Sequence, residues 1–395
     1  QLSGAALRLA RVAALAGPDF DAELAAAVLE QHPIDIAEPW RELESAQVIR
    51  DGAFAHDLIF EATRASVPQP IAQLLHRRIA EQLAARQALP ERQAPHWAGA
   101  AQWQRAGEAY AAAARRAHGA SQRTHEVECW QLAADAFEKA AAPEQAFEAR
   151  CESIHSMIVV QGVTHANGVI ESLLQTATSD HQRAAALTAK ATAALMAADH
   201  QAGIAAAVQA FDLTRHFDSP WPGFQAARLH AVGLAQAGRS AQALAIIEPY
   251  RMLVEDGATP EQRGRFWADY AYVLNGARRL RDTAFALQQA LDNAQALGDL
   301  AELATLTSNL ATVRGNLGQV EDALALARRS QALQAQLGAT DGPEGAVVET
   351  YAALYCAMTG QYGEALERLD SAIACFLRDK QLLWVAVRSE ERRVG

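Results

Sequence analysis

The sequence predicts a mostly all-α protein, in which a small domain with one short β-hairpin precedes a long array of paired helices. Three observations lead to this fold class. Alanine dominates the apolar half of the composition and aromatic residues make up only 6%, which favours many thin helical pairs over one deep core. A small-residue motif recurs in the second half of the chain, as helical repeats require. One Asp-Gly turn between two short β-like runs indicates the hairpin.

The first expected elements are three helices. Residues 2–17 (LSGAALRLARVAALAG) end in a Gly-Pro stop signal. Residues 19–31 predict a second helix with Asp19 as its N-cap. Residues 36–47 predict a third, although Pro39 interrupts its pattern.

A β-hairpin is expected over residues 48–54 (VIRDGAF), because Asp51-Gly52 separates two short β-like runs. Three helices followed by a two-stranded hairpin is the layout of a winged helix, which usually suggests DNA binding. The third helix is net acidic, however, whereas a helix that docks on phosphates should be basic. The expected role is therefore regulatory or protein–protein contact, with no direct contact to nucleic acid.

Composition excludes several classes of protein. The formal net charge is −11, and the basic residues are scattered rather than clustered as on a nucleic-acid surface. No apolar run is long enough to span a membrane, and we expect a cytoplasmic protein with no membrane contact. His125 and Cys129 lie one helical turn apart and could form half a metal site. With no second pair in view, no metal is expected.

The repeats share the motif Gly-x4-Ala-Leu. It occurs as GRSAQAL, GQVEDAL and GQYGEAL, which start at Gly238, Gly318 and Gly360. The alanines of these motifs are Ala243, Ala323 and Ala365, and Gly203 and Ala284 occupy the same position in other pairs. The five positions are separated by 40, 41, 39 and 42 residues. A small residue frees the tight turn after helix A of each pair, and the alanine lets helix B approach it closely.

These repeats resemble the tetratricopeptide repeat, a helical pair of about 34 residues with small residues at fixed positions. The resemblance covers about residues 165–380. The longer period, and Tyr272 at a small-residue position, depart from the pattern and indicate longer helices. The resemblance implies stacked pairs with an extended binding surface and no chemistry of their own.

Aromatic residues cluster in SPWPGF (219–224) and RFWADYAY (265–272), on adjacent repeats. They allow two interpretations: ordinary packing between repeats, or an apolar patch that binds a ligand or partner. The candidate binding residues are Trp221, Phe224, Phe266, Trp267 and Tyr270.

The run GAFAHDLIFEATRASVPQPIAQLLHRRIAEQL (52–83) resembles the end of the winged-helix domain in STAND signal-transduction ATPases. These include bacterial transcriptional activators of the maltose-regulator type and of the SARP type with a bacterial transcriptional activation domain. His56-Asp57 resembles the Met-His-Asp motif of related ATPases, with Ala55 in place of the methionine. In that family the histidine contacts the β-phosphate of bound ADP and holds the resting state closed.

The chemistry of the two residues suits such an ADP-sensing lock. A histidine N–H can face a phosphate, and Asp57 at the start of the next helix can accept its first free N–H groups. The alternative is a capping aspartate beside a half-buried structural histidine. No GxxxxGK[ST] motif is present, so no phosphate cradle is expected in this chain. We predict no catalytic residue and no enzymatic activity here, and we assign ATP or ADP to an upstream nucleotide-binding domain of a longer parent protein.

The expected domains are a winged-helix regulatory domain at 1–66, connecting helices at 67–118 and the repeat array at 119–387. Residues 388–395 (RSEERRVG) break the alanine-rich pattern and resemble a translated sequencing adapter, so we expect them to be non-native. The chain begins at Gln1 and its first methionine is Met157. We therefore expect a fragment of a longer bacterial protein.

The expected function is that of the C-terminal sensor and regulatory part of an ATP-dependent transcriptional regulator of the STAND class. The array would bind an inducer, either a small molecule or a protein, and the winged helix would hold the ADP-bound resting state. Self-assembly is expected upon activation. One alternative is a passive tetratricopeptide scaffold for protein–protein interaction. Another is an accessory region of a signalling protein of the nucleotide-cyclase type.

Overall fold

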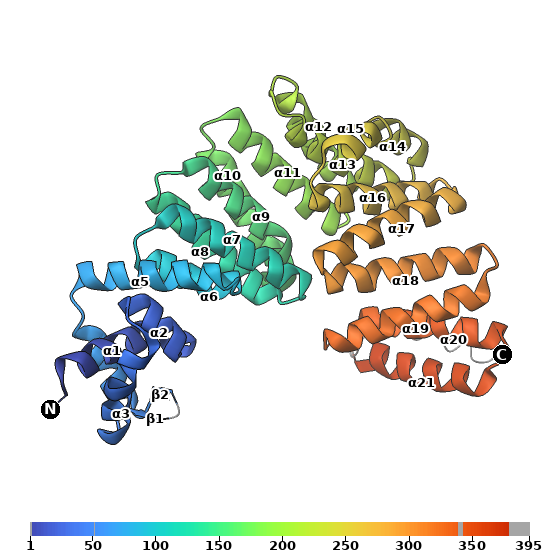
Figure 1. Ribbon diagram of the computed structural model, residues 1–395. Coiled ribbons are helices and arrows are strands. Elements are labelled where there is room, and N and C mark those ends of the chain that lie inside the picture. The colour runs from blue at the N-terminus through green and yellow to red at the C-terminus, as the bar shows by residue number, and fades with distance from the viewer. Residues whose placement is uncertain (1, 51, 339–342, 379–395) are drawn as a thin grey trace. The chain divides into compact units, whose positions relative to one another are not determined.

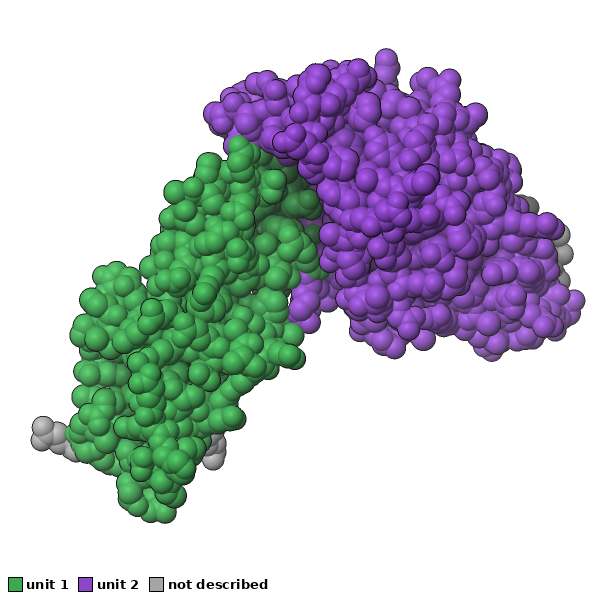
Figure 2. Space-filling view, turned by 45° about the horizontal axis from the view of Figure 1, so that its top comes forward, with its two compact units in different colours: residues 1–115, 125–153 green, residues 116–124, 154–395 purple. Residues whose placement is uncertain are grey.

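The computed structural model of the chain describes residues 2–50, 52–338 and 343–378. It divides into two compact units, residues 1–115 with 125–153 and residues 116–124 with 154–395 (Figure 2). The segment expected to be non-native, 388–395, lies outside the described residues, as does Asp51 of the predicted turn.

The first unit begins with three α-helices and a β-hairpin (Figure 1). The elements are α1 (Gly4–Ala16), η1 (Gly17–Asp19), α2 (Ala22–Leu29), η2 (Pro33–Ile36), α3 (Ala37–Ser45), β1 (Ile49–Arg50), β2 (Ala53–Phe54) and α4 (Asp57–Ala65). Ile49 pairs with Phe54 in antiparallel register. Gly52 has a φ of 81°, a left-handed conformation that favours glycine in a hairpin turn. The predicted hairpin is confirmed.

Two local predictions in this region are wrong. The N-cap of α2 is Asp21, whose Oδ1 accepts the backbone N–H of Leu24 at 2.6 Å. Asp19 instead lies in η1, where it is buried and pairs with Arg92. Pro39 does not interrupt α3, because it lies in the first turn, where a backbone N–H has no partner within the helix.

The core of this region joins α1 to α5 (Gln69–Ala85). Leu9 and Val12 of α1 are fully buried, and the same apolar cluster contains Ile79 and Leu83 of α5. Burial of large aliphatic side chains on both helices stabilises their packing by about 1.5–3 kcal/mol per side chain. Helix α5 is therefore part of the N-terminal core.

Beyond α5 the described chain is a series of α-helices in antiparallel pairs (Figure 1). They are α6 (Pro90–Gly99), α7 (Trp103–Gly119), α8 (Arg123–Lys139), α9 (Pro143–Gln161), α10 (Val163–Thr176), α11 (Asp180–Met196), α12 (His200–Thr214), α13 (Trp221–Gln236), α14 (Ser240–Ile247), α15 (Tyr250–Gly257), α16 (Pro260–Gly276), α17 (Leu280–Leu297), α18 (Leu300–Asn316), α19 (Val320–Gln336), α20 (Pro343–Met358) and α21 (Tyr362–Arg378). No strand follows Phe54 among the described residues, and none of their helices is long and apolar enough to cross a membrane. The predicted mostly all-α fold is confirmed.

The predicted turns within the pairs lie where the motif places them. Gly238, Gly318 and Gly360 have φ of 75°, 79° and 80°, and each follows the first helix of a pair. At two equivalent turns, Ala198 and Arg278 adopt the same left-handed conformation, both with φ of 59°. The chain thus repeats one turn geometry with glycine in some pairs and without it in others.

Close approach of the paired helices also matches the motif. A Cβ added to Gly203 of α12 would lie 2.6 Å from the Leu195 side chain of α11. In the corresponding positions of α14 and α19, Ala243 and Ala323 are completely buried. Small residues are therefore required here because the helices touch.

In the second unit, several first helices of successive pairs, which we call A helices, contact one another. Helix α13 contacts α11 and α16, and α18 contacts α20. The second helices, α17, α19 and α21, pack on their own A helices (Figure 1).

Candidate functional site

His56 and Asp57 lie at the start of α4, directly after the hairpin. His56 is the N-cap residue, with extended backbone (φ −146°, ψ 136°), and its side chain makes no capping hydrogen bond. Asp57 is the first helical residue, and its carboxylate has no hydrogen bond to any described residue. Asp57 therefore does not cap α4. Both side chains are exposed to solvent.

The surroundings of this pair are apolar and open. Leu58 is 81% exposed, and α4 contains no buried residue. The Phe54 ring of the hairpin contacts Phe60 edge to face at 5.5 Å, and the Arg64 guanidinium lies 5.8 Å from the Phe60 ring centroid. Exposed apolar surface next to unpaired polar groups is typical of a docking face. Among the described residues, none forms a side-chain hydrogen bond with His56.

The five aromatic candidates of the array are brought together by α13 and α16. Phe266 stacks on Tyr270 with ring centroids 5.4 Å apart and lies 6.2 Å from Phe224. Phe224 and Phe266 are completely buried, and Trp267 and Tyr270 are at most 5% exposed. Trp221 alone is half-buried. The rings form the core of the second unit, as the packing interpretation predicts, and offer no open ligand patch.

The polar edge of this aromatic core is satisfied internally. The Tyr270 hydroxyl donates to Oε1 of Glu248 at 3.3 Å. Burial raises the pKa of Tyr270 above its usual range, and the nearby Glu248 carboxylate raises it further. The hydroxyl stays protonated and forms part of the packed core.

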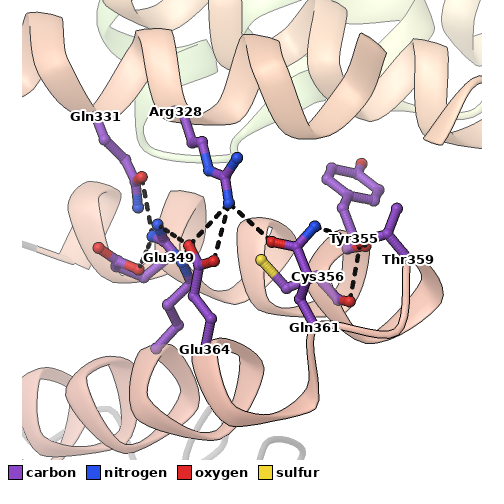
Figure 3. A network of polar contacts seen from close by, with 9 residues as sticks. Arg328, Gln331, Glu349, Tyr355, Cys356, Thr359, Gln361 and Glu364 are labelled. Carbon is purple, nitrogen blue, oxygen red and sulfur yellow. Dashed lines mark hydrogen bonds and ion pairs between the residues drawn. The ribbon is translucent and has the colours of Figure 1, made fainter. Parts of the chain in front are cut away.

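Sequence reasoning missed a polar network in α19, α20 and α21 (Figure 3). Its members are Arg328 and Gln331 of α19, Glu349 of α20, and Gln361, Glu364 and Arg368 at the start and in the first half of α21. Arg328 donates to Glu364 at 2.9 Å and to Gln361 at 3.0 Å, and Arg368 donates to Glu349 at 2.8 Å and to Glu364 at 2.7 Å. Hydrogen bonds from Arg368 and Arg328 lower the pKa of Glu364. The only sequence signal was the i, i+4 spacing of Glu364 and Arg368.

A second unpredicted cluster lies in the first unit. Nδ1 of His76 lies 2.9 Å from Nδ1 of His96, and Nε2 of His96 lies 3.8 Å from Oδ2 of the buried Asp19. Burial, together with the neighbouring His96 and Arg64, lowers the pKa of His76 to about 4. With both rings neutral, one Nδ1–H donates to the other ring. The cluster ties η1 to α5 and α6.

The predicted half of a metal site remains a pair. Sγ of Cys129 lies 3.6 Å from Nε2 of His125. Within residues 2–50, 52–338 and 343–378, no group of three or more His, Cys, Asp or Glu side chains could hold a metal ion. His125 and Cys129 lie one turn apart on α8.

Comparison with known proteins identifies the repeat. Residues 302–378 match the family model of the tetratricopeptide repeat. No curated protein matches the sequence. The family match covers α18 to α21, where the turns carry Gly318 and Gly360.

Solved structures extend the likeness of the fold. The chain is similar to the signal transduction ATPase with numerous domains (STAND) protein with a tetratricopeptide repeat sensor, PH0952 from Pyrococcus horikoshii, with 12% identity and a TM-score of 0.60. The similarity covers 99% of this chain and 60% of that one. BtubC (BKLC) from P. vanneervenii matches 60% of this chain, with 15% identity and a TM-score of 0.45. At such identities the PH0952 likeness shows a shared fold.

Proposed function

We propose that this chain is the sensor and regulatory part of an ATP-dependent regulator of the STAND class. The observation that carries the proposal is the fold likeness to a STAND protein with a tetratricopeptide repeat sensor, which extends over 99% of the chain. The small N-terminal region and the repeat array both fall within that likeness. The repeat array would bind an inducer or a partner protein, since stacked helical pairs present an extended surface.

In this proposal His56 contacts the β-phosphate of ADP held by a nucleotide-binding domain upstream in the same polypeptide. The exposed position of His56 at the N-terminus of α4 supports this role, because its ring is available to a second domain. The apolar surface at Leu58 and Phe60 would pack against that domain. Transcriptional control by the parent protein, self-assembly upon activation and the absence of catalysis in this chain are parts of the same proposal.

The test is ADP binding by isothermal calorimetry to the longer protein that includes the upstream domain. Loss of one hydrogen bond to a charged phosphate costs about 1.5–3 kcal/mol, so His56→Ala should weaken ADP binding by roughly ten- to a hundredfold. Asp57→Ala should have a smaller effect, because Asp57 does not cap α4. Neither variant should change nucleotide binding by the 395-residue chain alone.

A matched control is His32→Ala, which removes the exposed histidine that caps η2 in the same region. It should bind ADP as the wild type does. Equal ADP affinities of the wild type and His56→Ala would show that His56 does not contact the nucleotide. A longer protein that binds no nucleotide at all would favour the passive scaffold.

A further inference from the structure

A cavity of about 500 Å³ lies between two neighbouring turns of the second unit and is open to solvent. One wall is the turn between α11 and α12, together with the first turn of α12, and the other is the turn between α13 and α14. A volume of this size is typical of a site for a small molecule. The cavity therefore needs an account of its origin and of its chemistry.

Two long side chains hold these turns apart. Nδ1 of His200 in α12 lies 3.1 Å from Oε1 of Gln236 in α13. The residues 40 positions further along the chain are Ser240 and Gly276, where a Cβ added to the glycine would lie 2.7 Å from the serine hydroxyl. At that point the next two turns are in near contact. The cavity thus exists because a histidine and a glutamine occupy positions that carry small residues in the following pair.

Part of the lining is apolar. Ile204 of α12 contributes its side chain, and Ala198 and Ala237 contribute theirs from the two turns. A Cβ added to Gly233 of α13 would lie 2.8 Å from Cγ1 of Ile204, so the two helices pack closely there and hold the isoleucine in place. An aliphatic group of a ligand can be buried against this side chain.

Two opposite charges line the same cavity without meeting. Asp199 is the N-cap residue of α12, and its Oδ1 accepts the backbone N–H of Ala202 at 3.0 Å. Arg239 is the N-cap residue of α14, and its Nε donates to Oε1 of Gln242 at 2.8 Å. Within the described residues, neither charge forms an ion pair, and the terminal nitrogens of Arg239 have no hydrogen-bond partner. Both charges remain available to a ligand between them.

The two histidines near these charges differ in what they offer. An amide oxygen can only accept, so Nδ1 of His200 donates to Gln236 and Nε2 of the neutral ring is left as an acceptor. His230 of α13 lies near Arg239, and burial, followed by the charge of Arg239, lowers its pKa. His230 is therefore neutral near pH 7 and adds no charge. The lining presents one cation, one anion and one acceptor.

We propose that this cavity binds a free α-amino acid with an aliphatic side chain. The proposal rests on the proposed function, in which the array binds an inducer, and it names the chemical class of that inducer. The carboxylate pairs with the terminal nitrogens of Arg239, the ammonium group donates to Asp199 and to Nε2 of His200, and the side chain packs on Ile204. A molecule with only one of the two charges leaves the opposite charge of the protein without a partner.

The first experiment measures the unfolding temperature of the whole chain by circular dichroism in the presence of single amino acids. A ligand that binds the folded state raises this temperature. Valine, leucine or isoleucine should raise it, whereas aspartate, glutamate, lysine and arginine should not. Calorimetry then gives the affinity, here taken for leucine. Isocaproate, which lacks the ammonium group, and isoamylamine, which lacks the carboxylate, should each bind at least about tenfold more weakly.

Two variants assign each charge of the ligand to its partner. Arg239→Gln removes the cation, and Asp199→Asn removes the anion but keeps an N-cap residue. Each should weaken leucine binding by about tenfold or more. Arg239→Gln should not weaken the residual binding of isoamylamine, and Asp199→Asn should not weaken that of isocaproate. A general distortion of the cavity would weaken all three molecules in both variants.

Matched controls come from equivalent positions in other pairs. Arg279 is the N-cap residue of α17, and Asp299 is the N-cap residue of α18. Arg279→Gln and Asp299→Asn should leave the affinity for leucine unchanged. Unfolding curves without ligand check that all four variants are folded.

Three outcomes would overturn the proposal. They are no amino acid that raises the unfolding temperature, an analogue with one charge that binds as tightly as leucine, and leucine binding that is the same in the wild type, Arg239→Gln and Asp199→Asn. The affinity of the longer protein for ADP is measured separately, so failure here and failure of the proposed function are distinguishable.

Discussion

The aromatic core of α13 to α17 and the polar network of α19 to α21 are two ways of holding successive helical pairs together. In the first, Phe224 and Phe266 are completely buried and contact each other. In the second, Arg368 bridges Glu349 and Glu364 at a partly exposed site. Apolar burial depends little on salt and pH, whereas ion pairs require both charges and are screened by salt. Neighbouring parts of one array should therefore respond differently to the same change of solvent.

The largest effect is expected from Phe266→Ala. Removing a fully buried phenylalanine leaves a cavity and should lower the free energy of unfolding by about 3–5 kcal/mol. Urea denaturation followed by circular dichroism measures it. The control is Tyr272→Ala in the same helix, where the side chain is 47% exposed and the loss should stay below about 1 kcal/mol. Similar losses for both variants would contradict the assignment of the rings to the core.

A smaller and local effect is expected from Arg368→Gln. It leaves Glu349 and Glu364 without their shared cation; the site is partly exposed, so the cost should be about 1–2 kcal/mol. Hydrogen exchange should show faster amide exchange in α20 and α21 and no change in α16. Arg329→Gln removes an exposed arginine of α19 that lies outside the network and should leave exchange unchanged. Faster exchange throughout the array would mean that the network stabilises helices beyond α20 and α21.

The smallest expected effect is a difference between the stabilities of the two regions at acidic pH. The pKa of Glu364 is lowered in the folded chain by hydrogen bonds from Arg368 and Arg328. The unfolded chain therefore takes up this proton first as the pH falls below the ordinary value of 4.5. The stabilisation is fully present above that pH and is lost as the pH falls through the lowered pKa.

Amide exchange, corrected for its intrinsic pH dependence, should show α21 losing protection in that range before α16. In Glu364→Gln the difference between the two helices should vanish. Simultaneous loss of protection in α16 and α21 would count against a separate response of the network.

Features set by short stretches of sequence were predictable. The turns at Gly238, Gly318 and Gly360 and the hairpin at Gly52 follow from the backbone preferences of a few neighbouring residues. The repeated step of 39 to 42 residues then extends one local geometry along the array. His56 was also placed correctly at the start of a helix, since the motif lies directly after the hairpin.

Features that depend on distant residues were not predictable. Both apolar packing and ligand binding select aromatic side chains, so the pattern around Phe266 could not decide between them. From the local sequence, Asp19 and Asp21 are equally suitable N-caps for α2. Asp19 instead pairs with Arg92, a residue far along the chain. The network of Arg328 and Glu364 joins residues 36 apart. Neither the helical period nor the repeat step of 39 to 42 residues relates these two positions.

The left-handed turns carry a consequence for how this repeat diverges. Ala198 and Arg278 adopt the backbone conformation that Gly238 and Gly318 adopt without strain, at a cost of about 1 kcal/mol each. The packing of the flanking helices supplies that energy, so a lineage can lose its signature residue and keep its architecture. Repeats that have lost the glycine in this way would not be detected by a search for the motif, although they keep the same helical pair in the array.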